Sequence, residues 1–405
     1  MTEVEPRKLL FVAEPAGIAH TARLNAIAEA VVYAAEDSAE VVFAVTPEQD
    51  ETIATGSSVA RVSYPAAESM GEAMRNYQDL LSDVAPDEVV VDGNIAAMLA
   101  VVREDIPVAL VINSYFMPYH IGVAGEETTT MSNRAIAHFA NGVLRYKLRS
   151  YAREANLPFG GDIDSILAGV PIIFPEWPGY IPLKRQLPNF NYVGPVILDR
   201  LEGEQPDFEQ RALEQADCRP IVYVSFGGSG MPAEKLTEIV DQLSEKDYFL
   251  IVSLGRTASL DKLHLPEDNG IVAKYVPGLS ASNAANVIVS HGSQGMVTHA
   301  IMTGTPIVCL PYNFDQSFHS YKAQEYGMGV NLHRLPRKLD FFRTYNPSWL
   351  KKYADGIPSR VAVEAVTEVL ESSRYTQHAK QVQTRFGTVA NGSRKAAEVI
   401  LRTLI

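Results

Sequence analysis

Cysteine is scarce in this chain of 405 residues, which contains only Cys218 and Cys309. Two thiols cannot form the disulfide framework of a small secreted domain, and their spacing is not that of a zinc site. Cys309 also lies within an apolar run, where a thiol behaves as a small hydrophobic side chain. We therefore expect both cysteines to be reduced and neither to bind a metal.

Long hydrophobic runs are absent as well. No apolar stretch approaches the roughly 18 residues that a membrane-spanning helix needs, and residues 1–8 are polar, unlike a signal peptide. The composition, with 46% hydrophobic and 20% charged residues, is that of an ordinary globular protein. These features predict a cytoplasmic protein that makes no use of a membrane.

The sequence also lacks an excess of positive charge, because its formal net charge is -13. This balance disfavours nucleic acid as a partner, although a local basic pocket can still hold a diphosphate. The pattern G-x-G-x-x-G does not follow the first apolar run, Leu9 to Ala13. A nicotinamide-dependent dehydrogenase is therefore disfavoured.

The length and the order of apolar runs predict two α/β domains. A chain of 405 residues exceeds the size at which one hydrophobic core keeps growing. The chain opens with a predicted strand at Leu9 to Ala13, a helix at Thr21 to Ala35 and a strand at Val41 to Val45, an order typical of a parallel sheet. We expect an N-terminal domain over residues 1–200, a charged linker with a short helix over residues 201–219 and a C-terminal domain over residues 220–405.

The stretch from Val287 to Gln316 is the most informative part of the sequence. It predicts a strand at Val287 to Ser290, a tight turn at residues 291–295 and a helix capped by Ser293. The first turn of such a helix presents free amides and a positive dipole, which together bind phosphate groups. A second strand then brings Asp315 and Gln316 to the same sheet edge, where they can hold sugar hydroxyls. Any strand-helix-strand unit has similar turns, so glycine spacing alone leaves an ordinary turn open.

The same stretch resembles a known family. His291-Gly292-Ser293-Gln294-Gly295, then His299-Ala300, Gly304-Thr305-Pro306 and Pro311 through Asp315-Gln316 resemble the H-G-G-x-G-T, E-A, G-x-P and P-x-x-x-D-Q pattern of the UDP-glycosyltransferase superfamily. This resemblance implies inverting enzymes of GT-B fold, in which two Rossmann-like parallel-sheet domains face each other across a cleft. His299 replaces a glutamate that holds the ribose hydroxyls in the superfamily, so a UDP-sugar and a dTDP-sugar both stay open.

Two residues of the N-terminal half are candidates for catalysis. His20 follows the first predicted strand, and Asp92 ends a later one. From the residues alone, His20 is more typical of a capping or packing histidine, and Asp92 can cap the helix that follows. The resemblance implies instead that His20 is the general base and Asp92 orients it, although Ala19-His20-Thr21-Ala22-Arg23 keeps only the histidine of the pattern G-H-x-x-P.

Further contacts to the donor and the acceptor are implied by the resemblance. Residues 221–230 resemble V-Y-V-S-F-G-S, which places Gly227 and Ser229 at the diphosphate or ribose, with a plain turn as the alternative. Tyr275 and Val276 stand where relatives have a tryptophan and a valine, so Tyr275 is expected to stack on the nucleobase. Residues 114–159 correspond to the acceptor pocket, for which core packing is an equal explanation. The candidate acceptor contacts are Tyr115, Phe116, Met117, His120 and Phe139.

No metal and no resident cofactor are expected, because Asp162 and Asp164 follow a Gly-Gly turn and suit a helix cap better than a metal site. The sequence thus predicts an inverting glycosyltransferase that moves a hexose from UDP-glucose or a dTDP-sugar to a hydroxyl of a hydrophobic acceptor. A polyketide, a macrolide or an aromatic natural product is the expected acceptor, and the protein is expected to be a monomer or homodimer. Two alternatives of the same fold are a catalytically silent nucleotide-binding or auxiliary protein and a sugar-nucleotide epimerase.

Overall fold

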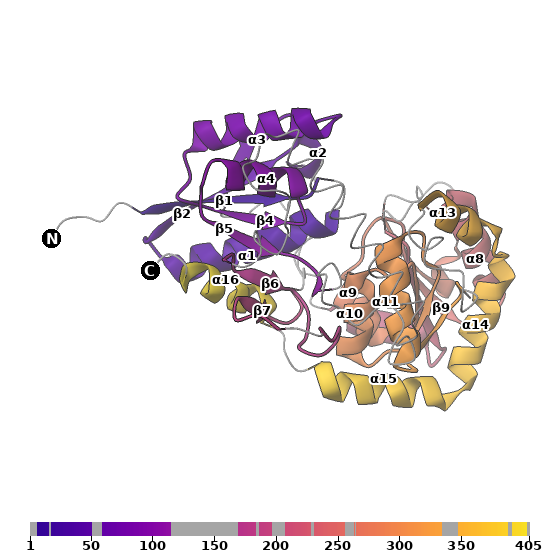
Figure 1. Ribbon diagram of the computed structural model, residues 1–405. Coiled ribbons are helices and arrows are strands. Elements are labelled where there is room, and N and C mark those ends of the chain that lie inside the picture. Colours follow the sequence, from indigo (N-terminus) through magenta and orange to yellow (C-terminus); the bar gives the residue numbers. More distant parts are fainter. Residues whose placement is uncertain are drawn as a thin grey trace, which may run out of the picture. The chain divides into compact units, whose positions relative to one another are not determined.

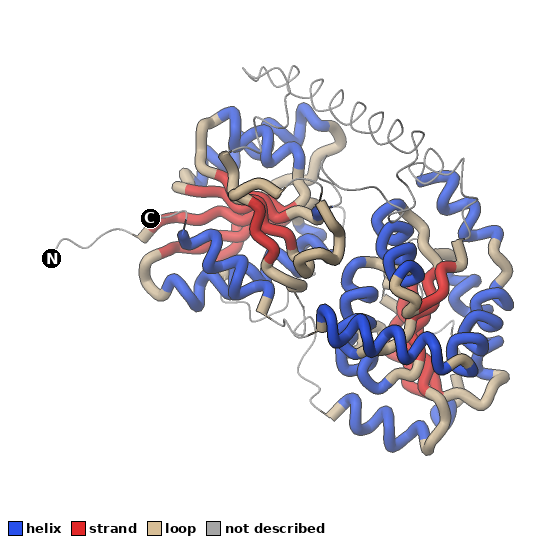
Figure 2. The backbone as a smooth tube through the Cα atoms, turned by 60° about the horizontal axis from the view of Figure 1, so that its bottom comes forward, coloured by secondary structure: helices blue, strands red, loops and turns tan. Residues whose placement is uncertain are grey.

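The computed structural model describes residues 6–15, 18–50, 59–114, 169–183, 186–196, 207–227, 231–255, 263, 265–333, 347–387 and 391–402. The chain divides into two compact units (Figure 1). The first comprises Met1–Leu201 and Val389–Ile405, and the second comprises Glu202–Thr388. Within each unit a central sheet lies between layers of helices (Figure 2), as expected of the α/β class.

The first unit is built on a seven-stranded sheet with the order β3-β2-β1-β4-β5-β6-β7. Every pairing in it is parallel. Parallel strands are covered on both faces and are therefore apolar along their length, and β4 is buried at every position. The strands are β1 (Arg7–Ala13), β2 (Ala39–Val45), β3 (Ala60–Ser63), β4 (Glu88–Asp92), β5 (Val108–Val111), β6 (Ile172–Phe174) and β7 (Phe190–Tyr192).

Alternate residues of these strands enter two different cores, because successive side chains of a strand point to opposite faces. Leu10 and Val12 of β1 pack with α3 and α4, whereas Leu9 and Phe11 pack with α1 and α16. Figure 1 shows these two helix pairs on opposite faces of the sheet. The last helix of the chain therefore completes the first unit. The helices are α1 (Ile18–Ala35), α2 (Pro47–Asp50), α3 (Met70–Val84), α4 (Ile95–Arg103) and α16 (Gly392–Arg402).

The second unit has a six-stranded, wholly parallel sheet with the order β10-β9-β8-β11-β12-β13. One face packs its apolar side chains against α8 and α14. The strands are β8 (Ile221–Ser225), β9 (Phe249–Ser253), β10 (Gly270–Ala273), β11 (Val287–Ser290), β12 (Ile307–Cys309) and β13 (Gly329–Asn331). The helices are α7 (Phe208–Ala216), α8 (Ala233–Ser244), α9 (Gly278–Ala284), α10 (Gln294–Thr303), α11 (Phe314–Glu325), α13 (Pro347–Gly356), α14 (Ser359–Glu371) and α15 (Ser373–Phe386), with a 3-10 turn at Glu267–Asn269.

Both sheets reverse their strand order at one place. In the first sheet β1 lies between β2 and β4, and in the second β8 lies between β9 and β11. The connections that leave such neighbouring strands run to opposite sides and leave a crevice at the carboxyl ends, where open α/β sheets bind ligands. Ala13 pairs with Asp92 at one reversal, and Ser225 pairs with Ser290 at the other. A ligand-binding site is therefore expected at the residues that directly follow these four positions.

Several local predictions need adjustment. Helix α1 begins at Ile18 rather than Thr21, so His20 lies in its first turn. The alternative that Asp92 caps the next helix is wrong, because Asn94 is the cap and its side chain accepts a hydrogen bond from the amide of Ala97 at 2.9 Å. By contrast, the short helix predicted within the linker is present as α7 (Phe208–Ala216), which is tied to α9 by a 2.6 Å hydrogen bond from Asn283 to Glu209. None of the helices in the described part of the chain is both long and apolar enough to cross a membrane.

Candidate active site

His20 and Asp92 meet at the reversal of the first sheet. Nδ1 of His20 lies 2.8 Å from Oδ1 of Asp92. The carboxylate is fully buried, whereas the His20 side chain is 32% exposed. Gly93 makes room for the ring, because a β-carbon at this position would lie 3.0 Å from Cε1 of His20. The contact engages Nδ1 and leaves Nε2 as the ring nitrogen that a substrate hydroxyl can approach.

Arg23 is a third member of this group. Its Nε donates to Oδ2 of Asp92 at 2.7 Å and its Nη2 to Oδ1 at 2.6 Å. Nη1 donates to Oδ1 of Asn113 at 3.2 Å. Burial by itself would raise the pKa of Asp92, but the positive charge of Arg23, together with His20, outweighs burial and lowers that pKa from its usual value. Asp92 is thus held as a carboxylate.

The predicted strand, turn and helix at residues 287–303 are present in the second unit. Ser293 caps α10, as its side chain accepts a hydrogen bond from the amide of Met296. Gly292 has a φ of 73°, and a β-carbon there would collide with the hydroxyl of Ser320. By contrast, a β-carbon at Gly295 would meet nothing within 4 Å. The beginning of α10 is therefore open over Gly295 and closely packed under Gly292.

One of the amides predicted to bind an anion at this turn already donates a hydrogen bond within the chain. The amide of Gly292 donates to Oγ of Ser290 at 2.9 Å. An anion at this turn would therefore use amides of the following residues, which belong to the first turn of α10.

His291 and Gly227 lie together at the reversal of the second sheet. A β-carbon at Gly227 would lie 3.5 Å from Cε1 of His291. The histidine is buried, and its Nδ1 has no hydrogen-bond partner among the described residues. Burial lowers the pKa of His291 to about 4, against opposing contributions from Asp315 and the backbone of Ser225. The ring is therefore neutral at pH 7 and keeps an unused polar atom inside the site.

His299 lies on α10 and packs against the beginning of α9. A β-carbon at Gly278 would lie 2.9 Å from Cε1 of His299. Burial lowers the pKa of His299 to about 4, so this ring is also neutral at pH 7. Tyr275 and Val276, both half-buried, come shortly before Gly278 in the chain. The structure thus brings the residues predicted for the nucleoside part of the donor into one region.

Asp315 and Gln316 lie in the first turn of α11, where a negative side chain is favoured by the helix dipole. Oδ1 of Asp315 is 3.6 Å from Nε2 of His319, one turn along the helix. The side chain of Gln316 is buried, and its Oε1 accepts a hydrogen bond from the amide of Tyr312 at 2.7 Å. This bond uses one acceptor site of the oxygen, and the amide nitrogen of Gln316 is the group that can donate to a ligand.

Comparison with known proteins agrees with this geometry. Residues 237–344 match the family described as "Erythromycin biosynthesis protein CIII-like, C-terminal domain". A PGL/p-HBAD biosynthesis glycosyltransferase of Mycobacterium tuberculosis is 22% identical over 428 residues, covering 98% of this chain and 92% of that protein. Among solved structures, the calicheamicin glycosyltransferase CalG4 is similar with a TM-score of 0.66 and 18% identity, covering 98% of each chain. The spinosyn rhamnosyltransferase SpnG, complexed with thymidine diphosphate, gives a TM-score of 0.62 and 16% identity, covering 98% of this chain and 99% of that chain.

The chain is a glycosyltransferase homologue of GT-B fold. The predicted family resemblance, fold class and enzyme class are confirmed at this level. Several predictions made for this glycosyltransferase homologue concern residues outside the described part of the chain. They are the donor contact Ser229, the helix-cap residues Asp162 and Asp164, and the acceptor candidates Tyr115, Phe116, Met117, His120 and Phe139. Among the residues that are described, no cluster of three or more His, Cys, Asp or Glu side chains is placed to hold a metal ion.

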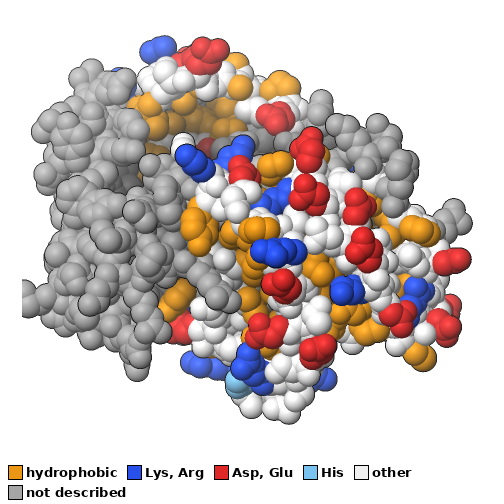
Figure 3. Space-filling model, turned by 90° about the vertical axis from the view of Figure 1, so that its right-hand side faces the viewer, with side chains coloured by type: hydrophobic (Ala, Val, Ile, Leu, Met, Phe, Trp, Pro, Cys, Tyr) orange, Lys and Arg blue, Asp and Glu red, His pale blue; other side chains and the backbone are white. Residues whose placement is uncertain are grey.

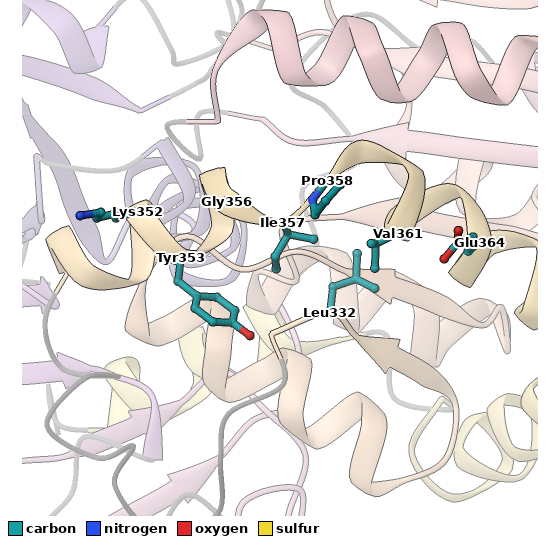
Figure 4. Close-up of a pocket in the computed structure, with 8 residues that line it drawn as sticks. All are labelled: Leu332, Lys352, Tyr353, Gly356, Ile357, Pro358, Val361 and Glu364. Atoms are coloured by element: carbon teal, nitrogen blue, oxygen red, sulfur yellow. The ribbon is translucent and has the colours of Figure 1, made fainter.

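The structure also shows a pocket of about 710 Å³ in the second unit of the glycosyltransferase homologue. It lies between α13, α14 and the residue that follows β13, and Leu332, Tyr353 and Ile357 point toward one another in it (Figure 4). None of the predicted donor residues lines this pocket, so it does not coincide with the predicted site. On the face shown in Figure 3, acidic, basic and hydrophobic side chains are interspersed rather than gathered by type.

Sequence reasoning missed Arg23 as a member of the site. Arg23 lies three residues after His20, but the predicted helix began at Thr21 and left His20 in the loop before it, so a shared helix face was not indicated. It also occupies the position of the proline in the superfamily pattern, so the residue appeared only as a departure from that pattern.

Proposed function

We propose that this protein is an inverting glycosyltransferase that moves a hexose from a nucleoside-diphosphate sugar to a hydroxyl group of a hydrophobic small molecule. The observation that carries the proposal is the His20–Asp92 pair, in which a buried carboxylate holds Nδ1 and a partly exposed ring presents its other nitrogen. This is the arrangement of a general base that is oriented by a third group.

In this reaction, Nε2 of His20 takes the proton of the acceptor hydroxyl as that oxygen attacks the anomeric carbon. The new bond joins the acceptor oxygen to this carbon, and the bond from the carbon to the phosphate oxygen breaks. The nucleoside diphosphate leaves with the electron pair, and attack from the opposite face inverts the configuration. No oxidant or reductant is needed.

The second unit supplies the contacts for the donor. In this proposal the amides at the beginning of α10, chiefly those of the capping Ser293 and of Gly295, hold the diphosphate together with the neutral ring of His291. Gly227 gives the ligand close access beside that ring. Asp315 and the amide nitrogen of Gln316 hold hydroxyls of the hexose. We expect the transfer to require no metal, and a chelator should leave the rate unchanged.

We favour a deoxythymidine diphosphate sugar as the donor. His299 stands where the superfamily has a glutamate, and a neutral, half-buried ring cannot accept from two ribose hydroxyls as a carboxylate does. A deoxyribose has no 2′-hydroxyl to hold. The similar protein SpnG was solved with thymidine diphosphate, which agrees with this choice.

The donor is tested by thermal unfolding of the full chain with UDP-, dTDP- and GDP-sugars, because a ligand that binds only the folded state raises the melting temperature. We expect dTDP-sugars to give the largest rise. A panel without any rise would contradict a nucleotide-sugar site. Turnover is then measured with hydroxylated polyketide, macrolide and aromatic acceptors.

Replacement of His20 tests the chemistry separately from binding. The variant His20→Gln should lose about 10²-fold or more in turnover while donor binding stays nearly unchanged. His378→Gln, at a histidine that lies on α15, is the matched control and should behave like the native protein. Donor binding without transfer in the native protein would favour a silent binding protein, and conversion of the donor without any acceptor would favour an epimerase.

A further inference from the structure

Arg23 contacts both the proposed base, His20, and the carboxylate that orients it, Asp92. Arg23 is 8% exposed and its guanidinium grips both oxygens of a fully buried carboxylate. Nη2 of Arg23 also lies 3.2 Å from Nδ1 of His20. One positive charge therefore lies against the same ring atom that faces Asp92.

The charges around His20 determine how readily its ring takes up a proton. A carboxylate alone at 2.8 Å favours the protonated imidazole, whereas a guanidinium at 3.2 Å opposes it. Asp92 and Arg23 together are neutral, and Asn113, which holds the far side of the guanidinium, is uncharged. Among the described residues, Glu14, which follows β1, is a further acidic residue beside this site, because its Cβ and the His20 ring both flank Gly93.

The two hydrogen bonds from the Arg23 guanidinium also fix the orientation of the Asp92 carboxylate. Two parallel N–H donors allow one orientation of the carboxylate plane, and Asn113 anchors the guanidinium in turn. In this orientation Oδ1 faces Nδ1 of His20, so the proton of a neutral ring is kept on Nδ1 and Nε2 is left as the basic nitrogen.

We propose that Arg23 is a positioning residue for the base: it locks Asp92 in the orientation that serves His20 and cancels the charge of that carboxylate. Without the guanidinium, an uncompensated carboxylate would face Nδ1 of His20 and favour the protonated ring. The catalytic part of this inference rests on the proposed function, but the charge state of the ring can be measured without any substrate.

A purely structural ion pair is the competing explanation. In that case Arg23 only satisfies a buried carboxylate, and its removal lowers stability without changing the titration of His20. A pH titration therefore separates the two explanations, whereas loss of activity alone does not.

The experiment follows the ring Cε1–H signals of the full chain by NMR as a function of pH. The His20 signal is assigned by its loss in His20→Gln. We expect the midpoint of the His20 titration to rise by roughly 1–2 pH units in Arg23→Gln, the usual effect of leaving one opposite charge within about 4–6 Å. The double variant Arg23→Gln/Asp92→Asn, which removes both charges, should return the midpoint to near its native value.

Two further variants keep the test decisive if Arg23→Gln does not fold. Arg23→Lys retains the positive charge but not the two parallel hydrogen bonds to Asp92. In this variant the midpoint of the His20 titration should stay within about 0.5 pH units of the native one, while turnover falls several-fold. Arg61→Gln removes an arginine that pairs with Asp50 elsewhere in the same unit and should change neither quantity. The proposal would be overturned by an unchanged His20 midpoint in Arg23→Gln. It would also be overturned if the midpoint of the double variant rose as much as we expect for Arg23→Gln.

Transfer kinetics complete the test. If the native protein transfers a sugar, the acid limb of its kcat/KM profile should move to higher pH in Arg23→Gln by the same amount as the NMR midpoint. If no donor and acceptor pair gives transfer, the proposed function fails, yet the titration still decides whether Arg23 controls the charge of His20.

Discussion

The beginning of α10 offers a sharp test, because two glycines there differ in what surrounds them. At Gly292 the backbone has a φ of 73°, and a β-carbon would meet the hydroxyl of Ser320 and would lie 3.2 Å from Sγ of Cys309. At Gly295 a β-carbon would meet nothing. The same substitution to alanine should therefore have opposite effects on stability at positions three residues apart.

The magnitude for Gly292→Ala follows from two contributions. A left-handed backbone costs a residue with a β-carbon roughly 1–2 kcal/mol, and forcing a methyl group into a packed interior costs typically about 1–3 kcal/mol. We expect the free energy of unfolding to fall by roughly 2–5 kcal/mol in total. Adding Ser320→Ala, which removes the colliding hydroxyl, should recover most of the packing part but none of the backbone part.

Gly295→Ala is the matched control for stability and the probe for function. Alanine is favoured over glycine within a helix by about 0.5–1 kcal/mol, so this variant should be at least as stable as the native protein. The space above Gly295 is where we place the diphosphate, so the new methyl group should weaken donor binding about tenfold or more, as displacing the anion from the amides loses charge-assisted hydrogen bonds.

The assays are urea unfolding followed by fluorescence and donor affinity by calorimetry. A loss below about 1 kcal/mol in Gly292→Ala, or a double variant no more stable than the single one, would refute the packing argument. Unchanged donor affinity in Gly295→Ala would refute the proposed place of the diphosphate while leaving the stability argument intact.

Two further predictions concern burial. Burial lowers the pKa of His291 to about 4 from 6.5, so between these pH values the unfolded chain binds more protons than the folded one and the free energy of unfolding must fall as the pH falls. We expect urea unfolding to show a loss of about 2 kcal/mol from this residue between pH 7 and pH 5, and a flatter dependence of stability on pH in His291→Gln. An equally steep dependence in the variant would contradict the assignment. The second prediction concerns Lys235, which donates to the carbonyls of Ala354, Asp355 and Ile357 at the carboxyl end of α13. Lys235→Met should lower the free energy of unfolding by about 1–3 kcal/mol, because these carbonyl groups are left unpaired. A loss below about 0.5 kcal/mol in the same assay would show that water replaces the ammonium group.

Patterns with a local cause could be predicted from the sequence. The β-branched run before His291, the capping Ser293 and the glycines around it determine a strand, turn and helix within a few residues, and the structure has them. The continuous apolar run of the first strand, Leu9 to Ala13, also agrees with its place in the interior, because a parallel strand buries both faces.

Contacts between distant segments could not be predicted from the residues alone. His20 and Asp92 are separated by 72 positions, and only the parallel pairing of β1 with β4 brings them within hydrogen-bond distance. The resemblance to a family supplied this pairing, but it gave no reason to examine Arg23, which replaces a proline of the pattern. The hydrogen bond from the amide of Tyr312 to Oε1 of Gln316, which closes the turn before α11, also had no counterpart among the sequence predictions.

The departures from the superfamily pattern lie beside the retained groups, which makes their effects separable. Arg23 contacts the proposed base, His20, and the carboxylate of Asp92 within the first unit, whereas His299 lies with the predicted nucleoside contacts in the second unit. A change in Arg23 should therefore alter the pH dependence of transfer without altering the preference among donors. A change in His299 should do the reverse, and His299→Glu should improve binding of a UDP-sugar relative to a dTDP-sugar, because a carboxylate accepts from both hydroxyls of a ribose. Equal effects of either substitution on both properties would mean that the two groups do not act on separate parts of the reaction.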